Sequence, residues 1–435
     1  MPPKTKSPTA RLAIERFTLA NGLRVVVSPD LSAPVVGVNV SYDVGFRSEP
    51  EGRTGFAHLF EHLMFQGSDS VGKMEHARLV QGAGGVMNGS THPDYTNYFE
   101  ALPTGALELA LFLEADRMRA PRLTQENLEN QISVVQEEIR VNVLNQPYGG
   151  FPWITLPPVV FSTFPNTHDG YGGFADLEAA TLDDAQEFFE TYYAPGNAVL
   201  AVAGDVDADA VRALVERHFG DVAARQVPAR PDFGETWPVG ERRGSRTDAV
   251  APQPALAIGW RVPDPVGDLA AYLPCVVLAE VLAEGDASRL QRRLVLDGRI
   301  ATAVSAYLGT FGDPFDGRDP VLFTVEAHHP AEVAADTIVA AVDEELARLA
   351  TDGLAPGELE RVQARLSAQL LRSTDGVMGR TNSLAVLELL HGRGELLAEL
   401  PGLLAAVGEQ DVVAAAAART GPARGVLELV PGGAR

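Results

Sequence analysis

The stretch His58–Leu59–Phe60–Glu61–His62 places two imidazoles and one carboxylate within a single helical turn and a half. On an α-helix, His58 and His62 lie one turn apart and project from the same face. Glu61 follows His58 by three positions, so its carboxylate leans toward that face as well. Two histidines and a glutamate at this spacing are typical of zinc hydrolases, and the order is the inverse of the commoner His-Glu-x-x-His arrangement. The motif therefore predicts a helix that carries a zinc site.

A zinc ion held by two histidines usually takes a third protein ligand and leaves one position for water. Glu138, on a helix predicted over 125–142, is the candidate, because a carboxylate there can reach the motif helix across a helix–helix contact. Glu137 is the alternative ligand, but its face is turned away from Gln131. Gln131 lies two turns before Glu138 and is predicted to hydrogen-bond a metal ligand. In this arrangement the metal activates water, and Glu61 takes its proton and passes it to the leaving amine.

Composition and charge describe an ordinary globular chain and narrow the range of partners. Of the 435 residues, 46% are hydrophobic and 21% charged, and the net charge of −23 argues against nucleic acid as a partner. Cys275 is the single cysteine and lies in an apolar run, so a buried thiol is expected. No apolar stretch follows Met1–Lys6, and no window has the roughly 18 apolar residues of a membrane helix. We expect a cytoplasmic protein without a membrane segment.

Strand and helix patterns divide the chain into two similar halves. The first half carries a hairpin, a β-branched strand, the motif helix over 54–67, two more strands and two long helices. The second half repeats this order without the metal motif. Residues 225–249 are rich in Pro, Gly and charge, which predicts a linker. We expect an α+β fold from an internal duplication, with a zinc-binding domain over 1–224 and a metal-free domain over 250–435, each a mainly antiparallel sheet packed with helices.

The second half is predicted to begin with a strand over 255–260, a helix over 269–282 and a strand pair around 301–307 and 321–326. Helices over 331–349 and 356–372 and a final strand over 425–430 follow.

Further blocks of sequence surround the metal motif and Glu138. They are Asn21-Gly22-Leu23, Gly84-Gly85 through Asn88 to Asp94, Thr96-Asn97-Tyr98, Asn145-Gln-Pro-Tyr-Gly149, Tyr193-Ala-Pro-Gly-Asn197 and Gly204-Asp205. With these blocks the chain resembles, over almost its whole length, the inverzincin metallopeptidases of the pitrilysin and mitochondrial processing peptidase family, especially the half-length bacterial members. The resemblance implies a zinc-dependent endopeptidase subunit. It also implies that a partner subunit closes on it like a clamshell around a chamber that holds peptides or unfolded segments.

The resemblance further implies that an edge strand of the catalytic domain takes the substrate as an added strand, which reads the peptide backbone more than its side chains. The alternative is an ordinary edge strand covered by a loop. The residues expected to bind substrate are Val86, Met87, Asn88, Gly89, Ser90 and Thr91.

One departure from the family pattern concerns the second half. Members that act alone or as homodimers carry an Arg and a Tyr, seven residues apart, that grip the substrate backbone near the metal. Leu294 and Ala301 stand at these positions here. The simplest hypothesis is a catalytic subunit whose related, non-catalytic partner supplies the Arg/Tyr pair. Arg289 or Arg299 together with Tyr307 is the alternative source within this chain.

Two other functions are consistent with the sequence. The chain can be a non-catalytic subunit that keeps the fold for assembly or peptide binding, although the intact Glu61 argues against this. It can also be a maturase that trims leader peptides from one modified product. This alternative differs from a general endopeptidase only in its substrate. Other histidines are not expected to bind a metal. His92 is expected in a turn, and His328 and His329 in an exposed loop.

Overall fold

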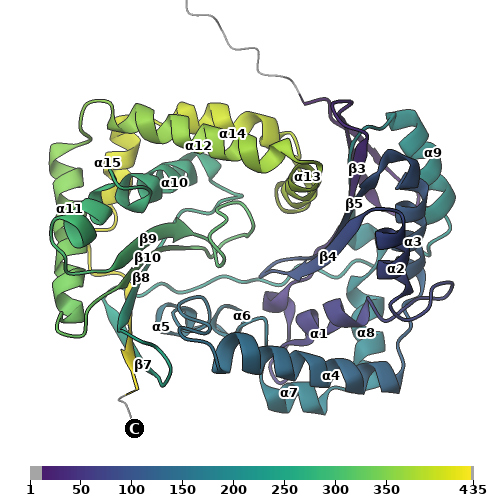
Figure 1. Cartoon of the computed structure of the whole chain (residues 1–435), viewed down its shortest axis with the longest axis horizontal. Helices are drawn as coiled ribbons and strands as arrows, with labels where there is room; N and C mark the ends of the chain where they lie inside the picture. The colour runs from purple at the N-terminus through teal and green to yellow at the C-terminus, as the bar shows by residue number, and fades with distance from the viewer. Residues whose placement is uncertain (1–11, 433–435) are drawn as a thin grey trace, which may run out of the picture.

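The computed structural model of the chain describes residues 12–432, which form two halves, each with one sheet and its own helices (Figure 1). The expectation for Met1–Lys6 concerns residues outside this range. The predicted α+β class is confirmed. No single helix of residues 12–432 is long and apolar enough to cross a membrane; only Leu396–Ala405 taken together with Glu409–Ala417, across an 89° bend, meets the length and composition limits.

The first sheet is six-stranded, and only its β2–β6 pair is parallel. Its strands, in spatial order, are β1 (Glu15–Thr18), β2 (Arg24–Pro29), β6 (Ala198–Gly204), β3 (Val35–Tyr42), β5 (Thr96–Pro103) and β4 (Val86–Thr91). The central strands β6 and β3 are rich in Val and Ala and almost wholly buried, as expected for strands covered on both faces. The predicted edge strand β4 has the bounds that the sequence indicated.

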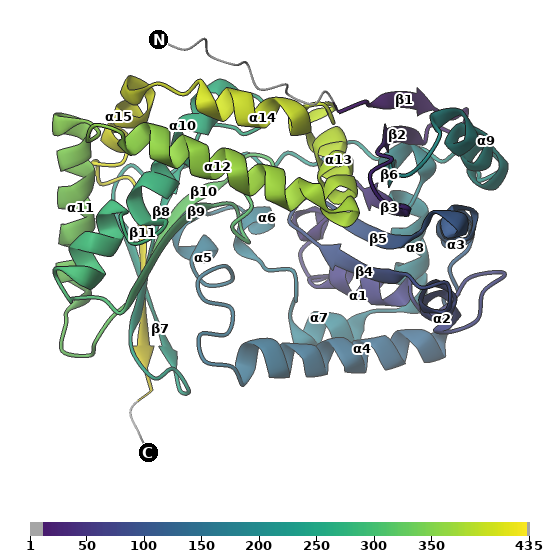
Figure 2. The ribbon, with the colours of Figure 1, turned by 45° about the horizontal axis from the view of Figure 1, so that its top comes forward.

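Helices of the first half pack below and beside this sheet, except for α5, which packs on strands of the second sheet (Figures 1 and 2). They are α1 (Phe56–Leu63), α2 (Glu75–Gly82), α3 (Leu107–Arg119), α4 (Gln125–Ile139), α5 (Pro157–Val160), α6 (Phe164–Thr167), α7 (Phe174–Ala179), α8 (Leu182–Tyr192) and α9 (Ala208–Phe219). The motif helix α1 is shorter than the predicted 54–67. It begins after Gly55, whose φ of +82° suits glycine and whose Cβ, if present, would lie 2.4 Å from the carbonyl oxygen of Tyr171.

The second sheet repeats the first with one strand fewer. Its strands, in spatial order, are β7 (Arg242–Asp248), β11 (Gly425–Pro431), β8 (Ala255–Arg261), β10 (Leu322–His328) and β9 (Ala303–Leu308). Only β7–β11 is parallel, so the order and directions match β2-β6-β3-β5-β4 pair by pair. This match supports the internal duplication.

The prediction of an irregular linker over 225–249 is wrong for its last part, which is strand β7. The sequence of β7, Arg-Arg-Gly-Ser-Arg-Thr-Asp, has no apolar residue, because it is an edge strand whose side chains alternate between exposed and half-buried positions. Its counterpart β2 lies inside the first sheet and is apolar.

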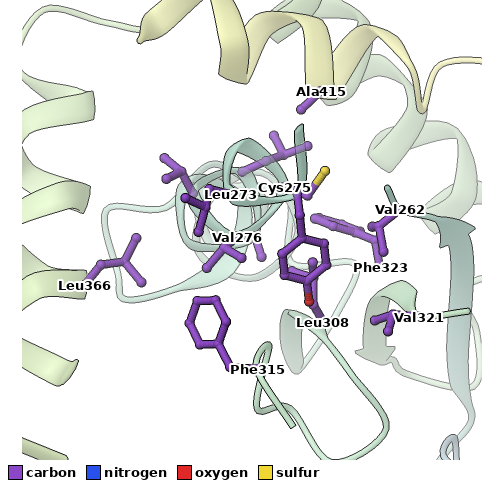
Figure 3. Packing of buried hydrophobic residues seen from close by; sticks show 14 of the residues in the cluster. Val262, Leu273, Cys275, Val276, Leu308, Phe315, Val321, Phe323, Leu366 and Ala415 are labelled. Carbon is purple, nitrogen blue, oxygen red and sulfur yellow. The ribbon is translucent and has the colours of Figure 1, made fainter. Parts of the chain in front are cut away.

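The core of the second half surrounds α10 (Leu269–Ala283), which is buried on all sides (Figure 3). Cys275 lies in this core, as expected. The other helices of this half are α11 (Ala335–Asp352), α12 (Glu358–Asp375), α13 (Val377–His391), α14 (Leu396–Ala405) and α15 (Glu409–Ala417). The sequence patterns predicted α11, α12 and β11 and missed α13, α14 and α15.

Helix α13 belongs to the second half of the chain but covers the first sheet, where it packs on β3 and β6 (Figure 2). The side-chain amide of Asn39 on β3 donates to Asn382 at 2.8 Å. Gly37 allows the close approach, because a Cβ there would meet the Thr381 hydroxyl. The two halves are therefore joined by a shared helix–sheet contact as well as by the chain between them.

Candidate metal centre and substrate strand

Helix α1 presents His58 and His62 to α4, which carries Glu138. The two Nε2 atoms are 3.3 Å apart, and Glu138 Oε2 lies 3.7 Å from His58 Nε2 and 3.4 Å from His62 Nε2. Four ligands bound tetrahedrally to zinc at about 2.0–2.1 Å are about 3.4 Å from one another. The three atoms therefore have the spacing of a zinc site with one position left for water. The alternative ligand, Glu137, is exposed and faces Arg140 at 3.2 Å.

The electrostatics of His58 and Glu138 suit metal ligands, whereas the pKa of His62 shifts in the opposite direction. Burial, and then the neighbouring His62, lowers the pKa of His58 to about 4, which keeps its imidazole in the neutral form that binds metals. A hydrogen bond from His62 lowers the pKa of Glu138 and keeps it ionised. Desolvation lowers the pKa of His62, but hydrogen bonds with Glu138 and Gln131 and the charge of Glu61 outweigh it and raise the value. Gln131 is buried beside the ligands, where the sequence placed it.

Glu61 projects from α1 toward strand β4. The Thr91 hydroxyl on β4 donates to Glu61 Oε2 at 2.6 Å, which fixes the carboxylate. Burial raises the pKa of Glu61, and this hydrogen bond opposes the rise. A Cβ on Gly89 would lie 3.1 Å from Glu61 Oε1, so the backbone of β4 passes directly over the carboxylate. Glu61 is thus placed between the metal ligands and the strand expected to bind substrate.

Strand β4 is the last strand of its sheet, paired with β5 on one side. On its other side it pairs with no strand of residues 12–432. Gly89 and Thr91 face α1, and side chains alternate along a strand, so Met87 shares their face while Val86, Asn88 and Ser90 face the opposite way. Ser90 Oγ donates to Asn97 at 2.6 Å across to β5. The free edge and the two faces fit the binding of an added strand.

A cavity of about 260 Å³ opens beside the metal ligands, and sequence reasoning missed most of its walls. It is lined by Phe46, His58, Glu61, Ser90, Thr91, Trp153, Gly170, Tyr171 and Phe311. The Tyr171 hydroxyl donates to Glu138 Oε1 at 3.3 Å, and its ring centroid lies 5.2 Å from that of His58. The segment 146–173, which includes α5 and α6, is rich in aromatic residues, but no spacing rule connects it to a helix nearly a hundred positions earlier.

The residues considered for the missing Arg/Tyr grip are not among those that line this cavity. Leu294 and Ala301 are buried in the apolar core of the second half. Arg289 is bound to Glu358 at 2.7 Å, and the Tyr307 hydroxyl donates to Glu326 at 3.3 Å. Arg299 is exposed. None of them lines the cavity beside the metal ligands.

The other histidines differ in part from expectation. His92 lies in the turn after β4, as expected, and His328 ends β10 with Nε2 3.1 Å from Glu326. His329 is buried, so its expected place in an exposed loop is wrong. The reason is that its backbone N–H continues the sheet by donating to the Pro254 carbonyl.

Among residues 12–432, one further group has the composition of a metal site: His76, Glu100 and Glu114. It is wholly buried, and Arg117 forms an ion pair with Glu114 inside it. The guanidinium already supplies the positive charge that a cation would bring, so this group does not compete with the motif for zinc.

The fold and the spacing of the site residues are those expected of metallopeptidases with the inverted zinc motif. The sequence profile described as Insulinase (Peptidase family M16) matches residues 24–148, and the profile described as Peptidase M16 inactive domain matches residues 179–366. The chain belongs to peptidase family M16 and has the half-length form found in bacteria.

Relatives and solved structures agree with this assignment. The zinc protease PqqE of Helicobacter pylori is 29% identical over 83% of this chain and 80% of its own length. A probable mitochondrial-processing peptidase subunit beta of Arabidopsis thaliana is 25% identical over 88% of this chain and 72% of its own length. The crystal structure of a protease from Helicobacter pylori superposes with a TM-score of 0.88 at 26% identity, covering 97% of this chain and all of that one.

Proposed function

We propose that this chain is a zinc-dependent endopeptidase that cleaves peptides or unfolded segments laid along β4. The observation that carries the proposal is the position of Glu61. Its carboxylate lies next to three ligand atoms spaced for zinc and directly under β4, whose outer edge pairs with no strand of residues 12–432. A scaffold that only binds peptides has no use for a buried carboxylate at that point.

The residues divide the chemistry between them. His58, His62 and Glu138 would hold the zinc ion, which when bound lowers the pKa of water and polarises the scissile carbonyl. Glu61 accepts the proton of the attacking water and then gives it to the leaving amine. Thr91 holds Glu61 in place through the 2.6 Å hydrogen bond to Oε2.

The substrate is bound by strand addition in this proposal. A peptide paired with the free edge of β4 satisfies the strand's outward N–H and C=O groups and places alternate side chains on the face toward α1. Gly89 has no side chain on that face, so the peptide backbone can approach Glu61. Backbone pairing makes the enzyme tolerant of side-chain sequence.

A second, related chain completes the site in this proposal. Leu294 and Ala301 are apolar and buried, and Arg289 is engaged by Glu358 and Glu345, so the backbone grip expected in the family has no candidate in this cavity. A partner that lacks the metal motif and carries the Arg/Tyr pair would supply it and close the chamber.

The test combines zinc content with peptide cleavage. Wild type, Glu61→Gln and the matched control Glu137→Gln are purified, zinc-loaded and incubated with a mixed peptide library, each alone and together with a related chain that carries the Arg/Tyr pair. All three are expected to bind one zinc per chain. Cleavage by Glu61→Gln should fall by about 10²–10⁴-fold, whereas Glu137→Gln should match wild type, because Glu137 is exposed beside the site.

Two results would overturn parts of the proposal. If zinc-loaded wild type with its partner cuts no peptide that Glu61→Gln leaves intact, the chain is a non-catalytic subunit. Full activity of the chain alone refutes the need for a partner. Cleavage confined to a single leader peptide identifies a dedicated maturase, whereas many products identify a general endopeptidase.

A further inference from the structure

The loop 309–321 of the second half reaches across to the catalytic half. It joins β9 to β10, and in the duplicated fold its counterpart is the short turn 92–95 that joins β4 to β5. The two connections contact each other. The longer one therefore brings residues of the second half to the end of the strand that carries Ser90 and Thr91.

Buried charges anchor this loop to the turn. Arg47 binds Asp94 through two contacts of 2.5 Å, and Asp94 Oδ2 also accepts the backbone N–H of Arg318 at 2.7 Å. The guanidinium of Arg47 donates to the carbonyl oxygens of Arg318 at 3.0 Å and Pro320 at 3.2 Å. The side chains of Arg47, Asp94 and Arg318 are all buried. Such a network holds the loop in one position, because separating its members would leave charges buried without partners.

A second contact ties the loop to β4 itself. His92 Nδ1 lies 3.1 Å from Asp316 Oδ2, and His92 Nε2 lies 3.0 Å from Ser90 Oγ. The His92 ring stacks on Tyr95 with the centroids 4.2 Å apart. The imidazole thus connects the loop to a residue of the substrate strand.

The tip of the loop carries Phe311. Gly309 and Gly312 flank it with φ values of +84° and +85°, a backbone conformation that favours glycine and turns the tip toward the catalytic half. The Phe311 ring centroid lies 5.4 Å from that of Trp153 and 5.7 Å from that of His92.

These contacts make a row of rings that ends at the metal ligands. The Trp153 ring is 5.7 Å from Tyr171, and Tyr171 is 5.2 Å from His58. Phe311 lines the same 260 Å³ cavity as His58 and Glu61, yet it remains 47% exposed. A rigidly anchored loop that leaves a large apolar ring half uncovered beside a reaction site has apolar surface available for a ligand.

We propose that Phe311 and Trp153 determine side-chain specificity, by receiving one aromatic or large aliphatic side chain of a peptide bound on β4. This inference rests on the proposed function. The loop supplies Phe311 from the same chain, whichever subunit supplies the backbone grip. His92 and Asp316 act as positioning residues, since they hold the loop against β4 and do not line the cavity beside the metal ligands.

The test measures binding separately from cleavage. Pairs of peptides are prepared that differ only in having Phe or Gly at one position, and each pair tests a different position. Each peptide is titrated against zinc-loaded Glu61→Gln, which should bind it without cutting. For one of these peptide positions, adding Phe311→Ala to the Glu61→Gln protein should weaken binding of the Phe peptide about tenfold and of the Gly peptide less than twofold. Phe311→Leu should restore most of the preference for Phe. The control is Val239→Ala, at a 97% exposed position in the segment between the halves.

The outcomes separate this inference from the proposed function. Equal losses for Phe and Gly peptides, no loss at any position, or a Leu variant that behaves like Ala would overturn the specificity role of Phe311. Because the loop tip is exposed, zinc content and melting temperature should stay at wild-type values, which excludes unfolding as the cause. If wild type cuts nothing but peptide binding still depends on Phe311, the proposed chemistry fails and the binding pocket stands.

Discussion

At the scale of single residues, the site depends on how tightly Glu61 is held. Its carboxylate is buried, and its partner Thr91 belongs to the substrate strand and not to the metal helix. A peptide that moves β4 therefore also moves the hydroxyl that orients the base. Under the proposed function, this hydrogen bond couples substrate binding on β4 to the orientation of Glu61.

Replacing Thr91 with Val tests this coupling. The substitution keeps the shape of the side chain and removes the 2.6 Å hydrogen bond to Glu61, so kcat should fall about tenfold while zinc content stays at one per chain. Peptide cleavage rates and metal analysis of the purified variant check both. The control is Thr104→Val, at the far end of β5 beside Asp205. A kcat equal to that of wild type would show that Thr91 does not orient Glu61.

At the same scale, sequence reasoning could find the ligands but not the walls of the cavity. Glu138 was preferred over Glu137 because of its helical phase with Gln131, and α4 places it accordingly. Tyr171 and Phe311 come from irregular loops, where no period relates position to direction. Their positions near His58 depend on how whole segments of the chain pack, and local sequence patterns do not predict that packing.

At the scale of elements, the proposed strand addition requires that β4 stay free on its outer edge and carry no side chain directly over Glu61. Gly89 meets the second requirement, because Glu61 and the Phe65 ring lie within 3.2 Å of where its Cβ would be. The requirement is local and involves no other strand.

Replacing Gly89 with Val should lower kcat/KM by more than about tenfold, because the side chain would press on Glu61 and occupy the space of the peptide backbone. Zinc content should not change. Gly105→Val is the matched control, since a Cβ there meets nothing within 4 Å. Normal cleavage by Gly89→Val would contradict binding of the substrate along this face of β4.

Helix α13 offers a pH test at the same scale. Its last residue, His391, has a pKa lowered to about 4 by burial and by the nearby Arg318, against an ordinary value of 6.5. Between these values the unfolded chain binds more protons than the folded chain, so the stability from neutral His391 is present above pH 6.5 and is lost as the pH falls toward 4. Between pH 7.5 and 4.5, wild type should lose about 2 kcal/mol more than His391→Gln.

Urea unfolding of both proteins at the two pH values measures this difference, and the comparison cancels the contributions of the other buried histidines. Equal losses in the two proteins would show that His391 is not buried in its neutral form in solution.

Sequence patterns located the strongly periodic elements. They failed for a helix that packs on the other half, for an edge strand and for the start of the motif helix. Helix α13 buries residues against β3, β6 and α12, so its apolar positions do not form one stripe. Strand β7 has no apolar residue because it is an edge strand. The motif helix begins at Phe56 and not at residue 54, because Gly55 lies against the Tyr171 carbonyl oxygen, a contact that the local sequence does not reveal.

At the scale of the whole molecule, the two halves act as one body because charged residues are buried between them. Arg318 of the second half binds Asp43 at 2.8 Å and donates its backbone N–H to Asp94, and Asp94 pairs with Arg47. The duplicated halves could fold with similar sheets and still rotate relative to each other. This network, together with α13, sets their relative position and with it the position of the loop 309–321.

Replacing Asp94 with Ala should cost about 3–5 kcal/mol of unfolding free energy, because the guanidinium of Arg47 would stay buried without its carboxylate. Urea unfolding at pH 7.5 measures the loss. Asp221→Ala, which removes the exposed partner of Arg119, should cost about 0–1 kcal/mol. A similarly small cost for Asp94→Ala would mean that the buried network around Asp94 does not hold the loop 309–321 against the catalytic half.

The central claim is that His58, His62 and Glu138 hold a zinc ion beside Glu61. Anomalous diffraction at the zinc edge, from crystals of the chain purified without chelators, tests it most directly. We predict one strong peak per chain, about 2.0–2.2 Å from His58 Nε2, His62 Nε2 and a Glu138 carboxylate oxygen. A site at these residues that stays without zinc, or a peak placed instead among His76, Glu100 and Glu114, would contradict the claim.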